Sequence, residues 1–173
     1  MQHLTHTRPA GADVPVLRVM RRLGGLAVLA GGAVHLQQYL GADYRVIPTI
    51  GPLFLLNAVG SGIVGLALLM PLERISTGRR LNLAVALLAL AGVIIALGSL
   101  VALYISETGA LFGFSESGYR AAIIVAIVAE VLTLLLLAPV AAIKIRQLSA
   151  DRGTRSTRRE WRPRSWPDHP TAS

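Results

Sequence analysis

The hydrophobic positions of the chain gather into four long runs that are bounded by charged segments. The runs cover 23–40, 50–70, 81–105 and 121–143. At a helical rise of about 1.5 Å per residue, each run is long enough to cross roughly 30 Å of hydrocarbon. A soluble protein with four such helices would need far more covering chain than 173 residues provide. The pattern therefore predicts an all-α fold, a transmembrane bundle of four antiparallel helices within 16–146. The predicted spans are about 20–41, 50–70, 81–105 and 119–143.

The composition agrees with a membrane protein and excludes several kinds of reaction and metal site. Hydrophobic residues make up 53% of the chain, and cysteine is absent. Without cysteine, disulfides, thiolate metal sites and thiol redox reactions are excluded. The basic residues are almost all arginine, and alanine, glycine and leucine are abundant, which is typical of a bacterial genome rich in G and C.

The placement of charge predicts the orientation in the membrane. The net charge is +8, yet every basic residue except Arg45 and Arg120 lies before the first run, in the 72–80 loop or after the fourth run. Basic residues accumulate on the cytoplasmic side. We therefore expect a multi-pass protein of the bacterial cell membrane with both termini in the cytoplasm. Because the sides of the membrane account for this distribution of charge, it does not indicate binding to nucleic acid.

The two ends of the chain are polar and are predicted to be disordered, over 1–15 and 147–173. The C-terminal segment is arginine-rich and has too few apolar residues to fold alone. One hypothesis is that this tail contacts anionic lipid headgroups, at about 1 kcal/mol per basic residue near the surface. The residues expected in that contact are Arg158, Arg159, Trp161 and Trp166. The alternative is a solvated tail that only enforces topology.

Glu130 and His35 are the ionisable residues expected deep within the spans. By helical rise, Glu130 lies about 16 Å from one end of its span and about 21 Å from the other. A carboxylate at that depth costs about 2.5–3.5 kcal/mol, so it is expected to face the other helices. The small residues Ala122 and Ala126 precede it at spacings of four, which lets a neighbouring helix approach.

Similar stripes of small and polar residues occur on the first two runs, whereas the third run is the least polar and is expected to be an apolar scaffold. Together the stripes predict a polar layer inside the membrane. Its candidate members are His35, Gln38, Asn57, Ser61 and Glu130. The alternative is structural: such side chains often join membrane helices by hydrogen bonds worth well under 2 kcal/mol each.

No pattern of catalysis or metal binding is present. A zinc site needs three or four ligands at short spacing. His35 is the only histidine in a span, so haem with two axial histidines cannot form within one chain. The chain has no phosphate-binding glycine loop and no nucleophile elbow. We therefore predict no catalytic residue, no metal and no cofactor, and a protein that is not an enzyme.

Two clusters of residues resemble small four-span membrane proteins that are common in actinobacteria. The first cluster is His35, Tyr44, Ile47, Pro48, Gly51, Leu53, Phe54 and Asn57. The second is Phe112, Gly113, Phe114, Gly118, Tyr119, Arg120 and Glu130. The resemblance implies the four-span fold and brings no chemistry with it. A looser likeness, in the number of spans only, is to DoxX-like proteins.

Three functional hypotheses follow. The first is a non-catalytic integral membrane protein that acts as an accessory or assembly subunit. The second is a small-molecule or proton-coupled carrier that uses Glu130, His35 and Asn57. The third is a membrane redox subunit that binds quinone or haem. The expected partners are a bilayer with anionic lipids and either another membrane protein or further copies of the chain.

Overall fold

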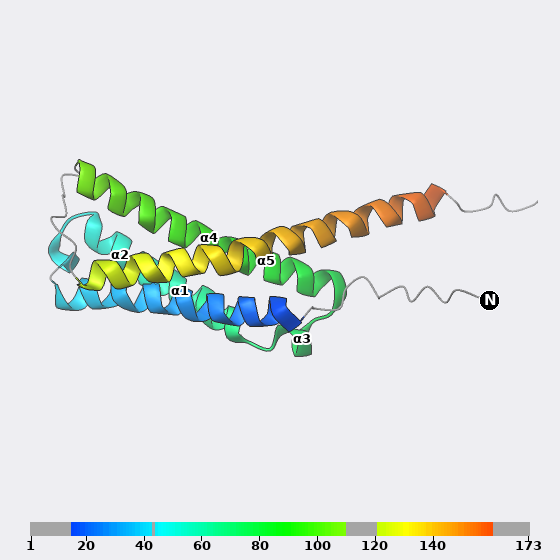
Figure 1. Cartoon of the computed structure of the whole chain (residues 1–173), viewed down its shortest axis with the longest axis horizontal. Coiled ribbons are helices and arrows are strands. Elements are labelled where there is room, and N and C mark those ends of the chain that lie inside the picture. Colours follow the sequence, from blue (N-terminus) through cyan, green and yellow to red (C-terminus); the bar gives the residue numbers. More distant parts are fainter. Residues whose placement is uncertain (1–14, 43, 110–120, 161–173) are drawn as a thin grey trace, which may run out of the picture.

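The computed structural model describes residues 15–42, 44–109 and 121–160 (Figure 1). The elements, in chain order, are α1 (Pro15–Gly41), the 3-10 helix η1 (Tyr44–Val46), α2 (Ile50–Leu69), α3 (Leu72–Ile75), α4 (Gly78–Thr108) and α5 (Ala121–Glu160). Of the described residues, 93% are helical and none is in a strand. The predicted all-α class is therefore confirmed.

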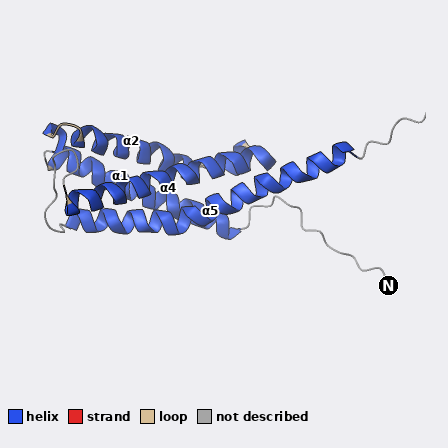
Figure 2. Ribbon diagram, turned by 90° about the horizontal axis from the view of Figure 1, so that it is seen from above, coloured by secondary structure: helices blue, strands red, loops and turns tan. Residues whose placement is uncertain are grey.

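The four long helices run side by side along the long axis and alternate in direction (Figures 1 and 2). Helix α1 packs on α2 and α5, and α4 packs mainly on α5 and less extensively on α2. We call the two ends of this arrangement the η1 end and the α3 end, after the short helices found there.

Within the part of the chain that the structure describes, three helices are long and apolar enough to cross a membrane: α2, α4 and the Ala121–Asp151 part of α5. Three of the four predicted spans are therefore supported. Helix α1 is less apolar because its run contains four glycines, His35 and two glutamines and follows a pair of arginines.

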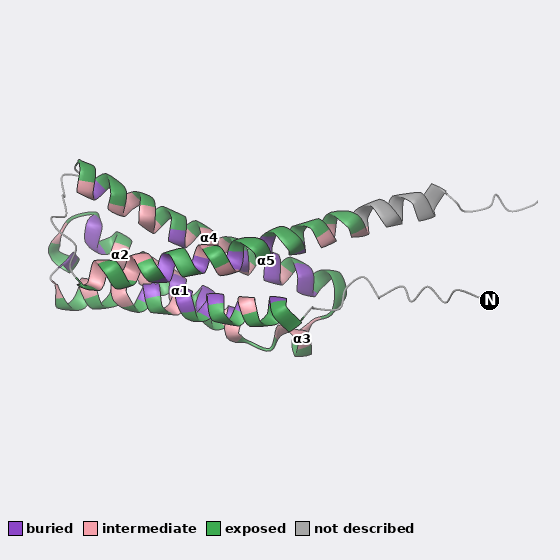
Figure 3. Ribbon diagram, viewed as in Figure 1, coloured by how far each residue is buried: buried purple, intermediate pink, exposed green. Residues whose placement is uncertain are grey.

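The burial pattern is typical of helices that face lipid (Figure 3). Large apolar side chains such as Leu56, Ile94 and Leu135 point outward and are mostly exposed. Small residues such as Ala89 and Ala96 fill the interior. Because large apolar groups outside and small residues between helices suit a lipid solvent, the packing agrees with a membrane protein.

At the α3 end, two basic side chains are buried. Arg21 is 1% exposed; its guanidinium donates to Glu73 Oε1 at 2.9 Å and to the Met70 carbonyl at 3.1 Å. Lys144 is equally buried, and its Nζ donates to Asn82 Oδ1 at 3.0 Å. These contacts join α1 to the end of α2 and α5 to the start of α4.

The prediction of a disordered tail from residue 147 is wrong over the part that the structure describes. Helix α5 continues to Glu160, well beyond the rest of the bundle (Figure 1). The preceding span supplies the helix nucleus, and the next proline is Pro163, so residues such as Gln147, Leu148 and Ala150 extend the helix at little cost.

Of the residues predicted to contact lipid headgroups, two lie on this helix and two lie outside the described residues. Arg158 and Arg159 lie on the extended helix. Trp161, Trp166 and residues 1–14 lie outside the described residues. Headgroup contact by this segment stays a prediction.

Candidate functional site

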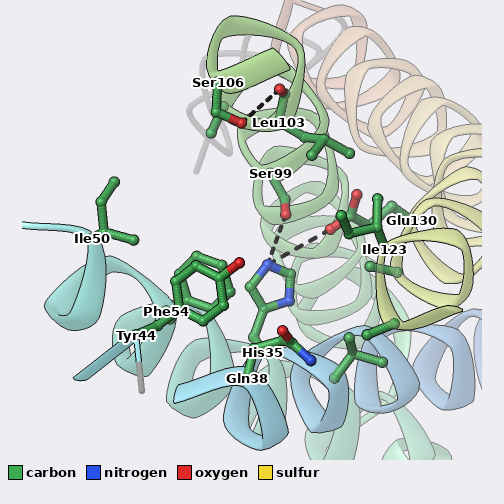
Figure 4. Close-up of a pocket in the computed structure, with 14 residues that line it drawn as sticks. His35, Gln38, Tyr44, Ile50, Phe54, Ser99, Leu103, Ser106, Ile123 and Glu130 are labelled. Carbon is green, nitrogen blue, oxygen red and sulfur yellow. Dashed lines mark hydrogen bonds and ion pairs between the residues drawn. The ribbon is translucent and has the colours of Figure 1, made fainter. Parts of the chain in front are cut away.

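A partly open cavity of about 100 Å³ lies at the η1 end, where α1, α2, α4 and α5 meet (Figure 4). Its polar lining includes His35 and Gln38 on α1, Ser99 and Ser106 on α4, and Glu130 on α5. Its remaining walls are mainly apolar, so the polar groups form a small cluster within a hydrophobic enclosure.

His35 presents one ring nitrogen to this cavity and uses the other to hold its orientation. Its Nδ1 lies 2.9 Å from the carbonyl oxygen of Gly31, one helical turn earlier. A carbonyl oxygen can only accept, so Nδ1 must carry the proton in this contact. In the neutral ring, Nε2 is then an acceptor, and it faces Ser99 and Glu130 (Figure 4).

Ser99 and Glu130 complete the cluster. Ser99 Oγ lies 3.0 Å from His35 Nε2, and Glu130 Oε1 lies 4.0 Å from the same nitrogen. Both ionisable residues are well buried, with Glu130 5% and His35 9% exposed. The cluster therefore places one carboxylate and one imidazole side by side away from bulk solvent.

Two aromatic rings form the wall beside His35. Phe54 lies between the rings of His35, at a centroid distance of 5.0 Å, and Tyr44, at 4.9 Å and nearly parallel. Gly51 allows this arrangement. A Cβ at position 51 would come within 2.8 Å of the Tyr44 carbonyl and 2.9 Å of the Arg45 carbonyl. Only glycine lets η1 lie this close to the start of α2.

A second, much smaller cavity lies on the other side of Glu130. It measures about 10 Å³, and its polar lining is Asn57, Ser61, Glu130 and Thr133. Ser61 donates to Asn57 Oδ1 at 3.1 Å. The volume is near the lower limit of about 10–15 Å³ for one buried water molecule. Further toward the α3 end, the core is closed by Leu68, Leu137 and Val140, all with no exposed surface.

The five residues of the predicted polar layer are thus distributed over two adjacent cavities. His35 Nε2 and Glu130 Oε1 lie 4.0 Å apart, and Gln38 lies at the larger cavity with its amide directed to Gln37 at 2.7 Å. Asn57 and Ser61 pair with each other and border the smaller cavity. Glu130 lines both cavities and connects them.

Ser99 is the member of the site that the sequence analysis missed. The third run was expected to be an apolar scaffold, yet α4 supplies the hydroxyl closest to His35. The available signal was the spacing of Gly92, Ala96 and Ser99, at four and then three residues, which places them on one helix face. The aromatic wall had no comparable signal, because its contact depends on the path of the loop before α2.

Among the described residues, no group of three or more histidine, aspartate or glutamate side chains is arranged to hold a metal ion. No protein-family model, curated protein or solved structure matches the chain. The resemblance to four-span actinobacterial proteins therefore stays a prediction.

The tautomer of His35 gives a first test of this geometry. We expect the neutral ring of His35 to carry its proton on Nδ1, because the Gly31 carbonyl can only accept. Nitrogen NMR of protein labelled at histidine distinguishes the two tautomers, and a His35→Gln variant assigns the signal. A proton on Nε2 would contradict the orientation described above.

Proposed function

We propose that the protein is a non-catalytic, multi-pass membrane protein that binds a small amphipathic molecule in the cavity at its η1 end. In this proposal α1 is the fourth span and completes a bundle of four antiparallel helices in a bacterial cell membrane. The α3 end, with the buried Arg21 and Lys144, faces the cytoplasm, in agreement with the distribution of basic residues.

The observation that carries the proposal is the convergence of His35, Ser99 and Glu130 on a cavity. Polar residues that only join helices bond directly across a packed interface. Here the polar groups border an open volume with apolar walls, which is the usual composition of a small-molecule site. A carboxylate kept inside the membrane also favours a functional role.

The same geometry ranks the other hypotheses. A carrier needs a route to the second side, and the closed core of Leu68, Leu137 and Val140 favours binding over transport. An accessory subunit remains compatible with a bound small molecule, and a partner that co-purifies would support that role. Haem is disfavoured by the small volume of the cavity.

The proposal predicts that filling the cavity removes binding. Ala126 lines it from α5, so Ala126→Leu should lower the affinity for single-ring probes about 10-fold or more. The probes are benzylamine, benzyl alcohol and benzoate, which share one ring and differ in the head group. Their dissociation constants can be obtained from the stabilisation of the purified protein in lipid nanodiscs as probe concentration rises.

Ala142→Leu is the matched control, because Ala142 lies on the same helix, is exposed and does not line the cavity. It should leave the probe affinities unchanged. Equal binding by wild type and Ala126→Leu, or no binding of any probe by wild type, would contradict the proposed function.

A further inference from the structure

We infer that the ligand of the cavity is an organic cation, a protonated amine attached to a small apolar body. The inference rests on the proposed binding function and names the chemical class of its ligand. It follows from the count of hydrogen-bond donors and acceptors around His35, Ser99 and Glu130.

The cluster of His35, Ser99 and Glu130 has more hydrogen-bond acceptors than N–H or O–H groups that can donate to them. With Nδ1 directed to Gly31, His35 offers Nε2 as an acceptor. The Glu130 carboxylate is a second acceptor, and Ser99 neighbours both groups. Ser99 has a single hydroxyl proton, so it can donate to one of the two at a time. His35 Nε2 and Glu130 Oε1 are 4.0 Å apart, too far for a direct hydrogen bond.

At least one buried acceptor therefore has room for a donor that a ligand would bring. Unsatisfied buried acceptors are unfavourable, most of all when they are charged. A primary ammonium group carries three N–H donors and a positive charge. Placed in the cavity, it can donate to Glu130, to His35 Nε2 and to the Ser99 oxygen.

The charges around the cavity also favour a cation. Among the described residues no lysine or arginine lines it, and His35 is neutral when Nδ1 alone carries its proton, so no positive charge of the described lining neutralises Glu130. The buried basic residues Arg21 and Lys144 belong to the α3 end of the bundle. An anion would meet the carboxylate without compensation. A neutral acceptor such as a quinone carbonyl would add a further acceptor to this cluster. Of the lining donors, Ser106 already donates to Leu103, and Gln38 uses one of its two amide N–H groups on Gln37.

The apolar walls and the volume of the cavity indicate the size and polarity of the rest of the ligand. Phe54, Ile50, Leu103 and Ile123 give an apolar surface around the polar cluster. The cavity holds about 100 Å³, somewhat less than the ~150 Å³ of an engineered cavity that binds benzene. A single ring or a short branched chain fits, with any longer part extending through the opening.

The test compares three probes that share one ring. Wild-type protein should bind benzylamine, protonated at neutral pH, at least about 10-fold more tightly than benzyl alcohol, and benzoate most weakly. Glu130→Gln keeps the shape of the side chain and removes its charge. It should weaken benzylamine about 10- to 100-fold, the usual effect of losing a hydrogen bond to a charged group, and change benzyl alcohol less than about 3-fold.

Glu107→Gln is the matched control. Glu107 lies on α4 at the same end of the bundle but does not line the cavity, so its loss should leave the order of the probes unchanged. If Glu130→Gln fails to fold, the ranking of the three probes on wild-type protein still decides.

Benzyl alcohol binding as tightly as benzylamine would overturn the inference, as expected if Glu130 carries its own proton, and would leave the proposed binding function intact. Absence of binding by all three probes would instead contradict that function.

Discussion

Replacing Arg21 with alanine is expected to destabilise the protein by about 2–4 kcal/mol. The Arg21 guanidinium is buried and donates to the Met70 carbonyl and to Glu73, so it ties α1 to the end of α2 and to α3. Each hydrogen bond to a charged group contributes about 1.5–3 kcal/mol, and truncation also leaves a void. Relief of the buried charge offsets part of the loss, since Arg21 Nε has no hydrogen-bond partner among the described residues.

The neighbouring Arg22→Ala variant separates this contact from the general effect of charge. Arg22 is exposed and lies next to Arg21 in α1, so both variants remove one basic residue from the same predicted cytoplasmic end. Arg22→Ala should change the unfolding free energy by no more than about 0.5 kcal/mol. Reversible unfolding in mixed micelles measures both variants. Equal stabilities, or a more stable Arg21→Ala, would show that the pair with Glu73 does not hold the helices together.

The sequence was sufficient to locate the four long helices, though not the end of α5, because membrane spans are encoded locally. A long apolar run must satisfy its own backbone hydrogen bonds in lipid, so it forms a helix whatever its neighbours are. Tertiary contacts are not encoded in this way. Arg21 appeared to be one of several flanking charges, and its burial depends on where α2 ends and α3 begins.

The candidate site was predictable in part for a related reason. Glu130 and His35 were identified because an ionisable group is unfavourable in lipid wherever it lies along a span. Their neighbour Ser99 is tolerated on any membrane helix, so its single hydroxyl gave only a weak signal. Tyr44 enters the cavity because Gly51 lets the loop approach α2, and that path is a property of the fold.

The last prediction concerns the packing that holds α1, and with it His35, against α2. A Cβ at Gly65 would lie 2.9 Å from the backbone oxygen of Gly25 and 2.6 Å from Leu29 Cγ. The backbone oxygen cannot move without moving α1. Gly65→Ala should therefore destabilise the protein by about 1–3 kcal/mol, the usual cost of overpacking.

The matched control is Gly62→Ala, three residues earlier on α2, where a Cβ would meet nothing within 4 Å. It should be neutral or stabilising by up to about 1 kcal/mol, since alanine is the better helix former. Gly65→Ala should also weaken binding in the cavity, because a shift of α1 displaces His35 from Phe54 and Ser99. Unfolding in mixed micelles and probe binding measure the two effects separately. If both glycine variants behave alike, close contact between α1 and α2 does not determine the geometry of the site.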